Sequence, residues 1–378
     1  MLRNSDKKWV FTKPRYGGAA WPCGEFGARF GRGLDEHQQL DSDSARLTGA
    51  KTVGAYDRDP CRWDGVAEAH LAHAVSCARH LQREELKKNR HNCFTNLGLL
   101  GRGSFGEVYK VLSREDGRQY AVKRSAHRFR GNSERNLSVR EARNHEHLCP
   151  HPHILKFVAA WEEYGRLYIQ TELCSTSLLL HAENQPPGPD EPAAWAYLCD
   201  LLSALQHLHS HGFVHLDLKP SNVLITDSGR LKLGDFGLLL QLRHKSSESV
   251  EGKVKDDAQE GDPRYMAPEL LRGKYGPAAD VFSLGVSILE LACNMEVPNG
   301  GEGWQQLRQG CLPSEFTSSL STELQTVLKM MLVPEPSKRP TVDELLALPS
   351  VRKHRWKRRF YLVVTETLLN LTSLGQGN

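Results

Sequence analysis

Two patterns of hydrophobic residues divide the chain. From Phe94 onward, short clusters of β-branched and aromatic residues at 108–111, 120–123 and 167–171 alternate with turn residues. Clusters of this kind are typical of strands. After Pro192 the apolar residues recur at the spacing of helices instead. This order predicts an α+β fold with two lobes: a small antiparallel β lobe with one main helix, and a larger helical lobe.

Two stretches of the second half predict buried helices. The first ends at Gly212 and has a stripe of leucines on one side, namely Leu198, Leu201, Leu202, Leu205 and Leu208. The second, FSLGVSILELAC from Phe282, is apolar on most sides. We therefore expect one compact domain over 94–348, with a strand-rich lobe at 94–173 and a helical lobe at 177–348.

The two ends of the chain have a different character. Residues 1–93 are rich in Gly, Asp, Arg and Pro in their first part and show no sustained period, which predicts a mostly disordered arm. Within this arm, only 64–89 favours a helix. Residues 349–378 form a tail in which a basic segment precedes an amphipathic one.

Composition narrows the setting of the chain. Forty-nine Lys and Arg against 45 Asp and Glu give a net charge of +4, too small to indicate nucleic acid as the partner. Nine scattered cysteines without a C-x-x-C pair are typical of a reducing compartment. We find neither a secretory signal nor an apolar stretch of roughly 18 residues. These features predict a cytoplasmic protein, with the nucleus less favoured.

Three glycines form the first candidate motif. Gly101, Gly103 and Gly106, followed by Val108, give G-x-G-x-x-G-x-V. Dinucleotide-binding folds use the same glycines but continue as a helix, whereas Val108 opens a β-branched and aromatic run. Strand, glycine turn and strand would bring backbone N–H groups close to phosphate oxygens. An ordinary glycine-rich hairpin explains these glycines equally well when they are taken alone.

A lysine in an apolar strand is the second feature. Lys123 follows Ala121 and Val122, and a buried ammonium group needs an anionic partner. A helix predicted from Glu134 to Leu148 carries Glu141 on the stripe of Leu137 and Leu148. We therefore pair Lys123 with Glu141, which orients the lysine toward the α and β phosphates of ATP. The alternative is two solvated charges, which the motifs below disfavour.

The segment VHLDLKPSN predicts the catalytic loop. Asp217 is suited to accept the proton of a substrate hydroxyl, and Lys219 to neutralise the transferring phosphoryl group. Asn222, and Asp235 of the Asp-Phe-Gly motif, offer hard oxygen ligands for Mg²⁺. Each motif alone is common in proteins. Their order and spacing together are specific.

On these motifs the chain resembles eukaryotic protein kinases over about two thirds of its length. The resemblance implies that Asp280 holds the catalytic loop and that Arg339 pairs with Glu269. It places Thr171 at a gate behind the adenine-binding hinge. The implied ATP-binding residues are Leu100, Gly101, Gly103, Gly106, Val108, Ala121, Lys123, Thr171, Glu172 and Cys174.

Two positions depart from the common kinase pattern. Leu216 stands where many kinases have an arginine that binds a phosphate on the activation segment. This predicts a kinase that is not switched by such a phosphate. Asp262 stands where Ser/Thr kinases usually have a threonine, although Lys219 is typical of Ser/Thr kinases. Local chemistry therefore leaves the choice of acceptor open.

The same segments resemble the Wee family, especially its membrane-associated branch. The matching stretches are EGDPRYMAPELL, 129–131, 160–163 and 293–310. The resemblance implies phosphorylation of Thr and Tyr in the Gly-rich loop of a cyclin-dependent kinase, with that kinase and its cyclin as partners and delayed entry into mitosis as the result. A general Ser/Thr kinase and a pseudokinase scaffold are the alternatives.

The tail suggests a location. Six Lys or Arg lie within 352–359, and the apolar stretch that follows contains Glu366 and Asn370, so it is too short and polar to span a bilayer. A helix would place Tyr361, Val364, Leu368 and Leu371 on one face. Residues 352–374 thus predict peripheral membrane contact, at the cytosolic face of the ER or Golgi. A solvated charge run before a helix that packs on the kinase is an equal alternative.

Overall fold

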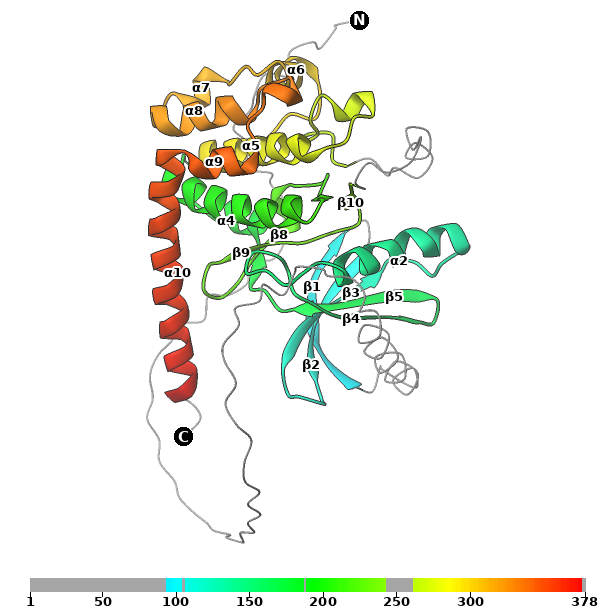
Figure 1. Cartoon of the computed structure of the whole chain (residues 1–378). Coiled ribbons are helices and arrows are strands. Elements are labelled where there is room, and N and C mark those ends of the chain that lie inside the picture. Colours follow the sequence, from blue (N-terminus) through cyan, green and yellow to red (C-terminus); the bar gives the residue numbers. More distant parts are fainter. Residues whose placement is uncertain (1–92, 104–105, 187, 243–260, 376–378) are drawn as a thin grey trace, which may run out of the picture. The chain divides into compact units, whose positions relative to one another are not determined.

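The computed structural model describes residues 93–103, 106–186, 188–242 and 261–375, with the backbone alone for 373–375. The predicted arm over 1–93 lies outside the described residues except for Cys93, and so does the helix expected at 64–89. Within the described residues a β lobe precedes a helical lobe (Figure 1). The predicted two-lobed α+β class is confirmed.

The N-terminal lobe is a five-stranded antiparallel sheet with the order β1-β2-β3-β5-β4. The three predicted strand clusters lie in β2, β3 and β5. The strands are β1 (Phe94–Gly103), β2 (Gly106–Ser113), β3 (Gln119–Ser125), β4 (Phe157–Glu163) and β5 (Arg166–Glu172).

The single long helix of this lobe, α2 (Asn132–Glu146), differs from the prediction. Leu137 is 43% exposed, and Leu148 lies beyond the end of the helix. The buried residues of α2 are instead Ala142 and His145, and Nε2 of His145 lies 2.6 Å from the Leu155 carbonyl oxygen. A mostly polar helix can be anchored by one buried, hydrogen-bonded histidine. The pattern of apolar residues in the sequence does not show such an anchor.

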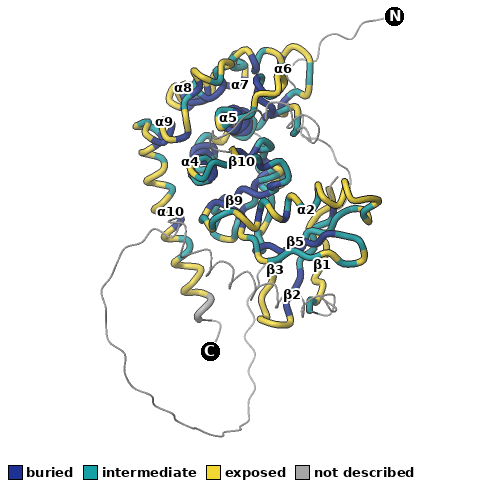
Figure 2. Tube along the Cα trace, turned by 45° about the vertical axis from the view of Figure 1, so that its right-hand side comes forward, coloured by how far each residue is buried: buried dark blue, intermediate teal, exposed yellow. Residues whose placement is uncertain are grey.

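The C-terminal lobe contains the main hydrophobic core. All five leucines of the predicted stripe on α4 are at most 1% exposed. Buried residues gather around α4 and α5 (Figure 2), among them Cys199 and Cys293, each 2% exposed. The helices are α3 (Leu178–Glu183), α4 (Glu191–Ser210), α5 (Pro277–Cys293), α6 (Gly301–Arg308), α7 (Ser314–Thr317), α8 (Thr322–Met331), α9 (Val342–Ala347) and α10 (Pro349–Gly375).

Short elements connect these helices around the catalytic segments. β8 and β9 form a hairpin that β6 extends, and β7 pairs with β10. They are β6 (Thr176–Ser177), β7 (Phe213–Val214), η2 (Pro220–Asn222), β8 (Val223–Ile225), β9 (Leu231–Leu233), β10 (Leu240–Gln241), η3 (Leu270–Arg272) and η4 (Pro336–Lys338).

A buried ion pair ties the activation segment to the C-terminal lobe. Arg339 donates to the Glu269 carboxylate at 2.6 and 3.1 Å, and both side chains are at most 6% exposed. The same guanidinium also donates to the Ala278 and Val333 carbonyls. Because the charges are paired and hydrogen-bonded, they are stable away from water. This is the pair that the kinase resemblance implies.

The tail is one continuous helix, α10, which runs along the C-terminal lobe (Figure 1). Val351 is fully buried against α4, and the His354 ring stacks on Trp195 with 4.3 Å between ring centroids. Among the described helices, α10 included, none has the length and apolar character needed to cross a membrane.

Candidate active site

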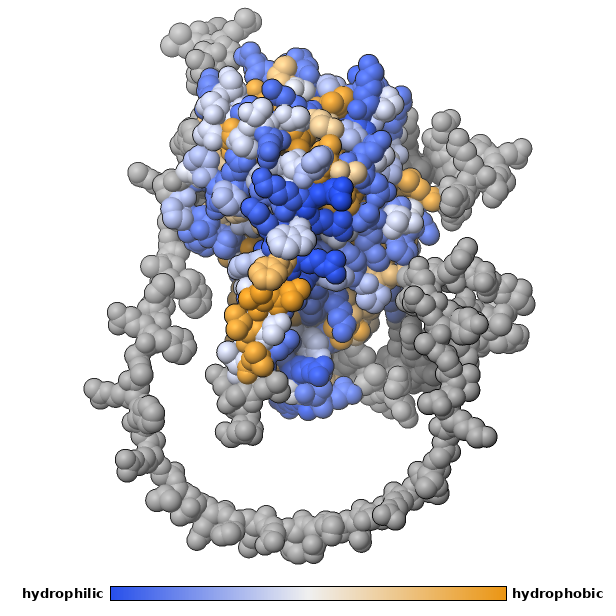
Figure 3. All heavy atoms as spheres, turned by 60° about the vertical axis from the view of Figure 1, so that its left-hand side comes forward, coloured by the Kyte–Doolittle hydropathy of each residue, from blue (hydrophilic) through white to orange (hydrophobic). Residues whose placement is uncertain are grey.

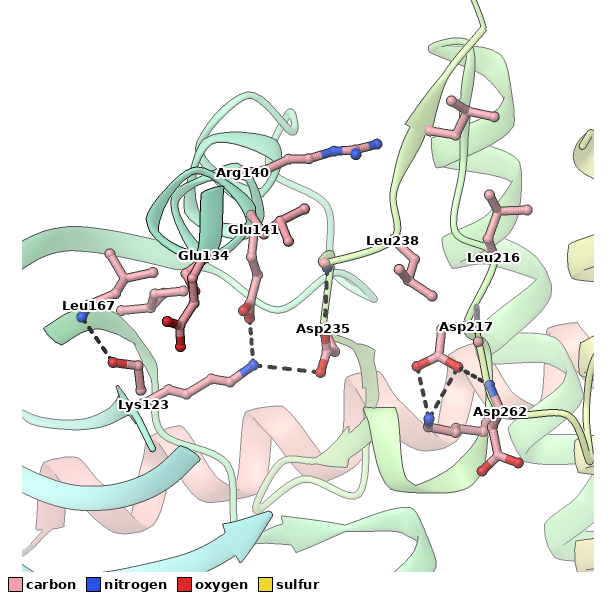
Figure 4. Close-up of a pocket in the computed structure, with 18 of the residues that line it drawn as sticks. Lys123, Glu134, Arg140, Glu141, Leu167, Leu216, Asp217, Asp235, Leu238 and Asp262 are labelled. Atoms are coloured by element: carbon pink, nitrogen blue, oxygen red, sulfur yellow. Dashed lines mark hydrogen bonds and ion pairs between the residues drawn. The ribbon is translucent and has the colours of Figure 1, made fainter. Parts of the chain in front are cut away.

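Lys123 on β3 lies between two carboxylates from distant parts of the chain. Its Nζ is 2.6 Å from Glu141 Oε1 on α2 and 3.6 Å from Asp235 Oδ2 (Figure 4). Burial alone would lower the pKa of Lys123, but the two carboxylates raise it above its usual range. The lysine therefore stays charged. The predicted Lys123–Glu141 pair is present, and it is joined to the Asp-Phe-Gly motif.

Gly103 and Gly106 lie where the end of β1 meets the start of β2. Gly101 is opposite Val108, and Gly103 is opposite Gly106. Gly106 has a φ of 156°, and a Cβ there would lie 2.1 Å from the Arg124 carbonyl oxygen, so no other residue fits without a shift. Leu100, beside this turn on β1, is 46% exposed.

The hinge residues lie where β5 ends. Ala121 pairs with Thr171, which is 9% exposed. The Glu172 carboxylate accepts from the Lys156 amide at 2.6 Å and from Lys232 Nζ at 2.8 Å. The bond to Lys232 links the hinge to the C-terminal lobe. Burial raises the pKa of the Cys174 thiol to about 12.

Asp280 on α5 holds the backbone of the catalytic loop by hydrogen bonds. The Asp280 carboxylate is fully buried and accepts from the His215 and Leu216 amides, each at 2.8 Å. Leu216 adopts a φ of 67°, a conformation that is strained for a leucine and that these bonds stabilise. The loop is therefore locked directly before Asp217.

Asp217 is the centre of a hydrogen-bonded group. Its Oδ2 lies 2.9 Å from Lys219 Nζ and accepts from Asn222 Nδ2 at 2.8 Å. Its Oδ1 accepts from the Asp262 amide at 3.1 Å. The donors fix the orientation of a carboxylate that is only partly buried, so it remains open to a bound hydroxyl group.

Asp235 and Asn222 lie close together. The Gly234 amide, next to Asp235, donates to the Asn222 carbonyl at 2.9 Å. Burial would raise the pKa of Asp235, but Lys123 and the Gly237 amide hold it below its usual range. The carboxylate is therefore ionised at neutral pH.

These two residues fit a magnesium ion that is also bound by phosphates. Asn222 Nδ2 donates to Asp217, which leaves the amide oxygen as the atom for a metal. The described residues contain no group of three His, Cys, Asp or Glu side chains that could hold a metal alone. Mg²⁺ usually takes one or two protein oxygens and completes its shell with substrate phosphates and water.

The end of the activation segment contacts Asp217 of the catalytic loop. A Cβ at Gly261 would lie 2.9 Å from the Leu216 carbonyl oxygen and 3.1 Å from Asp217 Oδ1, so the two segments are too close there for a side chain. The Asp262 carboxylate forms a two-pronged pair with Arg264 at 2.6 and 3.0 Å. Asp262 thus lacks the role of a hydroxyl side chain, but its backbone amide holds Asp217.

Helix α6 supplies a second support that the sequence did not indicate. Arg308, 7% exposed, donates to the Pro263 and Met266 carbonyls at 2.5 and 2.7 Å. Its guanidinium lies 3.6 Å from the centroid of the Trp304 ring, and the ring nitrogen of Trp304 also donates to Pro263. These contacts fix the backbone beside Asp262.

A cavity of about 650 Å³ connects these parts. It brings together the predicted residues Lys123, Glu141, Asp217, Lys219 and Asp235. Leu216, Leu238, Leu270 and Leu271 also line it, and Figure 4 shows Leu216 and Leu238 close to Asp217. Of the residues that the structure describes, neither the three glycines nor the hinge residues line this cavity. The lining extends instead from the α2 side, at Glu134 and Leu137, to Leu271 and Tyr275.

Comparison with known proteins agrees with this geometry. The protein kinase domain family matches residues 94–351. The chain belongs to the protein kinase family. The predicted resemblance to the Wee kinases is also confirmed, by relatives at 36–45% identity.

Three of these relatives are informative. The membrane-associated tyrosine- and threonine-specific cdc2-inhibitory kinase of Drosophila melanogaster is 45% identical over 71% of this chain and 49% of its own length. The corresponding kinase wee-1.3 of Caenorhabditis elegans is 42% identical, over 70% and 38%. The mitosis inhibitor protein kinase wee1 of Schizosaccharomyces pombe is 36% identical, over 75% and 34%. The chain spans half or less of each relative.

Proposed function

We propose that this kinase domain transfers the γ-phosphoryl group of ATP to protein hydroxyl groups, with Mg²⁺ as cofactor. The observation that carries the proposal is one cavity lined by Lys123, Asp235 and Asp217. We take the catalytic domain as 94–348, with lobes at 94–173 and 177–348.

Each residue of the site has one task in the proposed reaction. Asp217 accepts the proton of the acceptor hydroxyl while the hydroxyl oxygen bonds to the γ phosphorus and the bond to the β-phosphate oxygen breaks. Lys219 neutralises charge on the transferring group. Lys123, oriented by Glu141, binds the α and β phosphates. ADP leaves with the electrons of the broken bond.

The remaining site residues bind the nucleotide and metal. Asn222 and Asp235 would hold Mg²⁺, which neutralises the phosphate charge. Thr171, Glu172 and Cys174 would form the hinge beside adenine. The other residues proposed to enclose the nucleotide are Leu100, Gly101, Gly103, Gly106, Val108 and Ala121.

The activation segment supports activity without a bound phosphate. Leu216 has no charge with which to hold a phosphate group. Asp262 and Arg264 instead neutralise each other, and the Asp262 amide already contacts Asp217. We infer that the described part of the segment, from Gly261 onward, holds Asp217 in place without a phosphate. Treatment of the purified chain with a phosphatase should therefore leave its activity unchanged.

The proposed substrate is a cyclin-dependent kinase bound to its cyclin, phosphorylated on Thr and Tyr of its Gly-rich loop. This rests on the relatives, two of which are named as cdc2-inhibitory kinases and one as a mitosis inhibitor. Delayed entry into mitosis would follow. A general Ser/Thr kinase remains the alternative, because Lys219 is typical of that class.

Phosphosite mapping tests this assignment. The chain, Mg²⁺ and ATP are incubated with a catalytically inactive cyclin-dependent kinase bound to cyclin, and the modified residues are identified by mass spectrometry. We expect phosphate on the adjacent Thr and Tyr of the Gly-rich loop. Modification only at distant serines would refute the proposed substrate, and no transfer to any protein would favour a scaffold.

The outer face of α10 supports contact with a membrane surface. Phe360, Val363, Leu368 and Leu371 are 55–63% exposed, and the face predicted from the sequence is exposed throughout. Figure 3 shows the apolar residues on the distal half of α10, with hydrophilic residues above them. Five of the six predicted cations remain exposed, since only Arg358 points into the protein: Arg352, Lys353, Arg355, Lys357 and Arg359.

We expect this face to bind anionic lipid on the cytosolic side of internal membranes. Basic residues beside an apolar face add about 1 kcal/mol per charge near such lipids. Flotation with phosphatidylcholine vesicles, with and without phosphatidylserine, tests it. The chain should float only with the anionic lipid, and Leu368→Ser/Leu371→Ser should not float. Flotation unaffected by either change would refute membrane contact through α10.

A further inference from the structure

The two proposed metal ligands lie at the open end of the β8–β9 hairpin, one beside each strand. Asn222 directly precedes β8, and Asp235 follows β9 after Gly234. At this end the Gly234 amide donates a hydrogen bond of 2.9 Å to the Asn222 carbonyl oxygen, which joins the two chain segments. The distance between the two ligands therefore depends on how the hairpin is held.

Helix α10 holds the closed end of this hairpin through Arg358. Its Nη2 donates to the Gly229 carbonyl at 2.6 Å and to Asp200 Oδ2 at 2.7 Å. The same Asp200 oxygen accepts from the Leu231 amide at 3.0 Å. Arg358 and Asp200 are 10% and 2% exposed, so water competes little for these bonds.

Glu366 makes a second attachment to the same turn. Its carboxylate accepts from Arg230 Nε and Nη2 at 2.7 and 2.8 Å, and from the Ser228 hydroxyl at 3.2 Å. Leu362, midway between Glu366 and Arg358, is 3% exposed. The three residues lie four positions apart, so they form one inward face about 12 Å long.

The hairpin also contacts the hinge. Lys232 on β9 lies 2.8 Å from the Glu172 carboxylate. One hairpin therefore links α10, the proposed metal ligands and the proposed adenine site. Arg358 and Glu366 lie beyond residue 351, where the match to the kinase domain family ends, so these attachments come from outside the matched domain.

The geometry points to Arg358 and Glu366 as positioning residues that hold Asn222 and Asp235 at the spacing required for magnesium-bound nucleotide. This inference rests on the proposed function and deepens it. The final helix would then be part of the nucleotide site, with its outer face left for lipid. Loss of either attachment should weaken binding of the metal complex more than binding of the nucleotide alone.

Calorimetric titration of the full chain with ADP, with and without Mg²⁺, tests the inference. Because partners that orient metal ligands contribute tenfold or more to metal affinity, we expect Arg358→Met to weaken Mg·ADP binding about five- to tenfold. Binding of metal-free ADP should change by less than about twofold, and hydrogen exchange should increase at the 223–233 amides. Arg359→Met, at the exposed neighbouring arginine, is the matched control and should change neither affinity.

Exchange of the charges of Arg230 and Glu366 distinguishes loss of their ion pair from general damage to the fold. Glu366→Arg should weaken Mg·ADP binding, and Arg230→Glu combined with Glu366→Arg should restore it. Equal loss of both affinities in the Arg358 variant, or no loss in either single variant, would overturn the inference alone. A wild-type chain that fails to bind Mg·ADP would refute the proposed function and this inference together.

Discussion

The two lobes support the active site in different ways. In the N-terminal lobe the buried residues form two small clusters, one around Val111, Val122 and Tyr168 and one around Ala142 and Ile169. In the C-terminal lobe a single core extends from α3 to α10. The catalytic loop is thus anchored in a large core, whereas the proposed nucleotide-binding residues lie on a thinly packed sheet. A rigid catalytic loop and a more deformable nucleotide site suit an enzyme that must admit and release nucleotide.

The largest expected effect lies on the anchored side. Asp217→Asn removes the proposed proton acceptor but keeps the shape and most hydrogen bonds of the side chain, so activity should fall about 10³- to 10⁴-fold. Phosphate transfer and ADP affinity are measured on the same preparation. Phosphate transfer above a tenth of the wild-type rate would exclude Asp217 as the base. Unchanged ADP affinity would show that the nucleotide site is intact.

The next effect compares a buried ion pair of one lobe with an exposed pair of the other. Arg339→Ala leaves Glu269 buried without its partner and should lower the free energy of unfolding by about 3–5 kcal/mol. Arg135 pairs with Glu162 at 2.7 Å, but the side chains are 46% and 34% exposed. Arg135→Ala should therefore cost less than about 1 kcal/mol. Both free energies of unfolding are measured by urea denaturation. Equal losses in the two variants would contradict the expected difference between the buried and the exposed ion pair.

A pH-dependent effect should follow from Glu290 on α5. Burial raises its pKa to about 7 from 4.5, while Tyr265 donates to it at 2.7 Å. The folded state therefore binds the proton more tightly than the unfolded state, which stabilises the fold at low pH. This contribution is lost as the pH rises from about 4.5 through about 7, and amounts to at most about 3 kcal/mol.

Glu290→Gln should remove that dependence. Denaturation of the wild type and of the variant at pH 5, 6, 7 and 8 gives two profiles of unfolding free energy. We expect the variant to gain relative to the wild type as the pH rises. Profiles that stay parallel would show that Glu290 titrates as an ordinary carboxylate.

The smallest effect concerns the glycine turn. Gly106→Ala places a Cβ against the Arg124 carbonyl oxygen and should cost about 1–3 kcal/mol, with weaker ADP binding. Gly103→Ala is the matched control, since a Cβ there meets no described atom within 4 Å. Calorimetry and thermal unfolding of the two variants should differ. Equal losses of stability and ADP affinity in the two variants would show that the backbone adjusts to a Cβ equally well at both positions.

Much of this site was predictable because its residues lie in local sequence motifs. The pairing of Lys123 with Glu141 followed from one buried charge that needed another. The stripe of α4 followed from leucines at helical spacing. Leu137 misled the prediction of α2, because that helix is anchored by His145 and not by an apolar face. Patterns of hydrophobicity do not reveal a satisfied buried polar group.

The support by Asp280 was predicted from the kinase resemblance, but the supports supplied by Arg308 and Arg358 were not predictable. Arg308 contacts Met266 from 42 residues away, and Arg358 contacts Asp200 from 158 residues away. Nothing in local spacing distinguishes Arg358 from its charged neighbours, of which it alone turns inward. Likewise the side chain of Asp262 indicated a lost hydroxyl, whereas its backbone makes the contact with Asp217. Such roles depend on the tertiary fold.

The cysteines of the large core allow its opening to be timed chemically. Burial raises the pKa of the Cys199 and Cys293 thiols to about 12. At neutral pH such a thiol stays protonated, whereas an alkylating reagent attacks the thiolate. Each modification event would therefore record a local opening of the core, at Cys199 beside Val351 of α10 or at Cys293 beside Phe316 of α7. The rate of alkylation at these two cysteines, followed by mass spectrometry, would thus measure how often the core that anchors the catalytic loop opens.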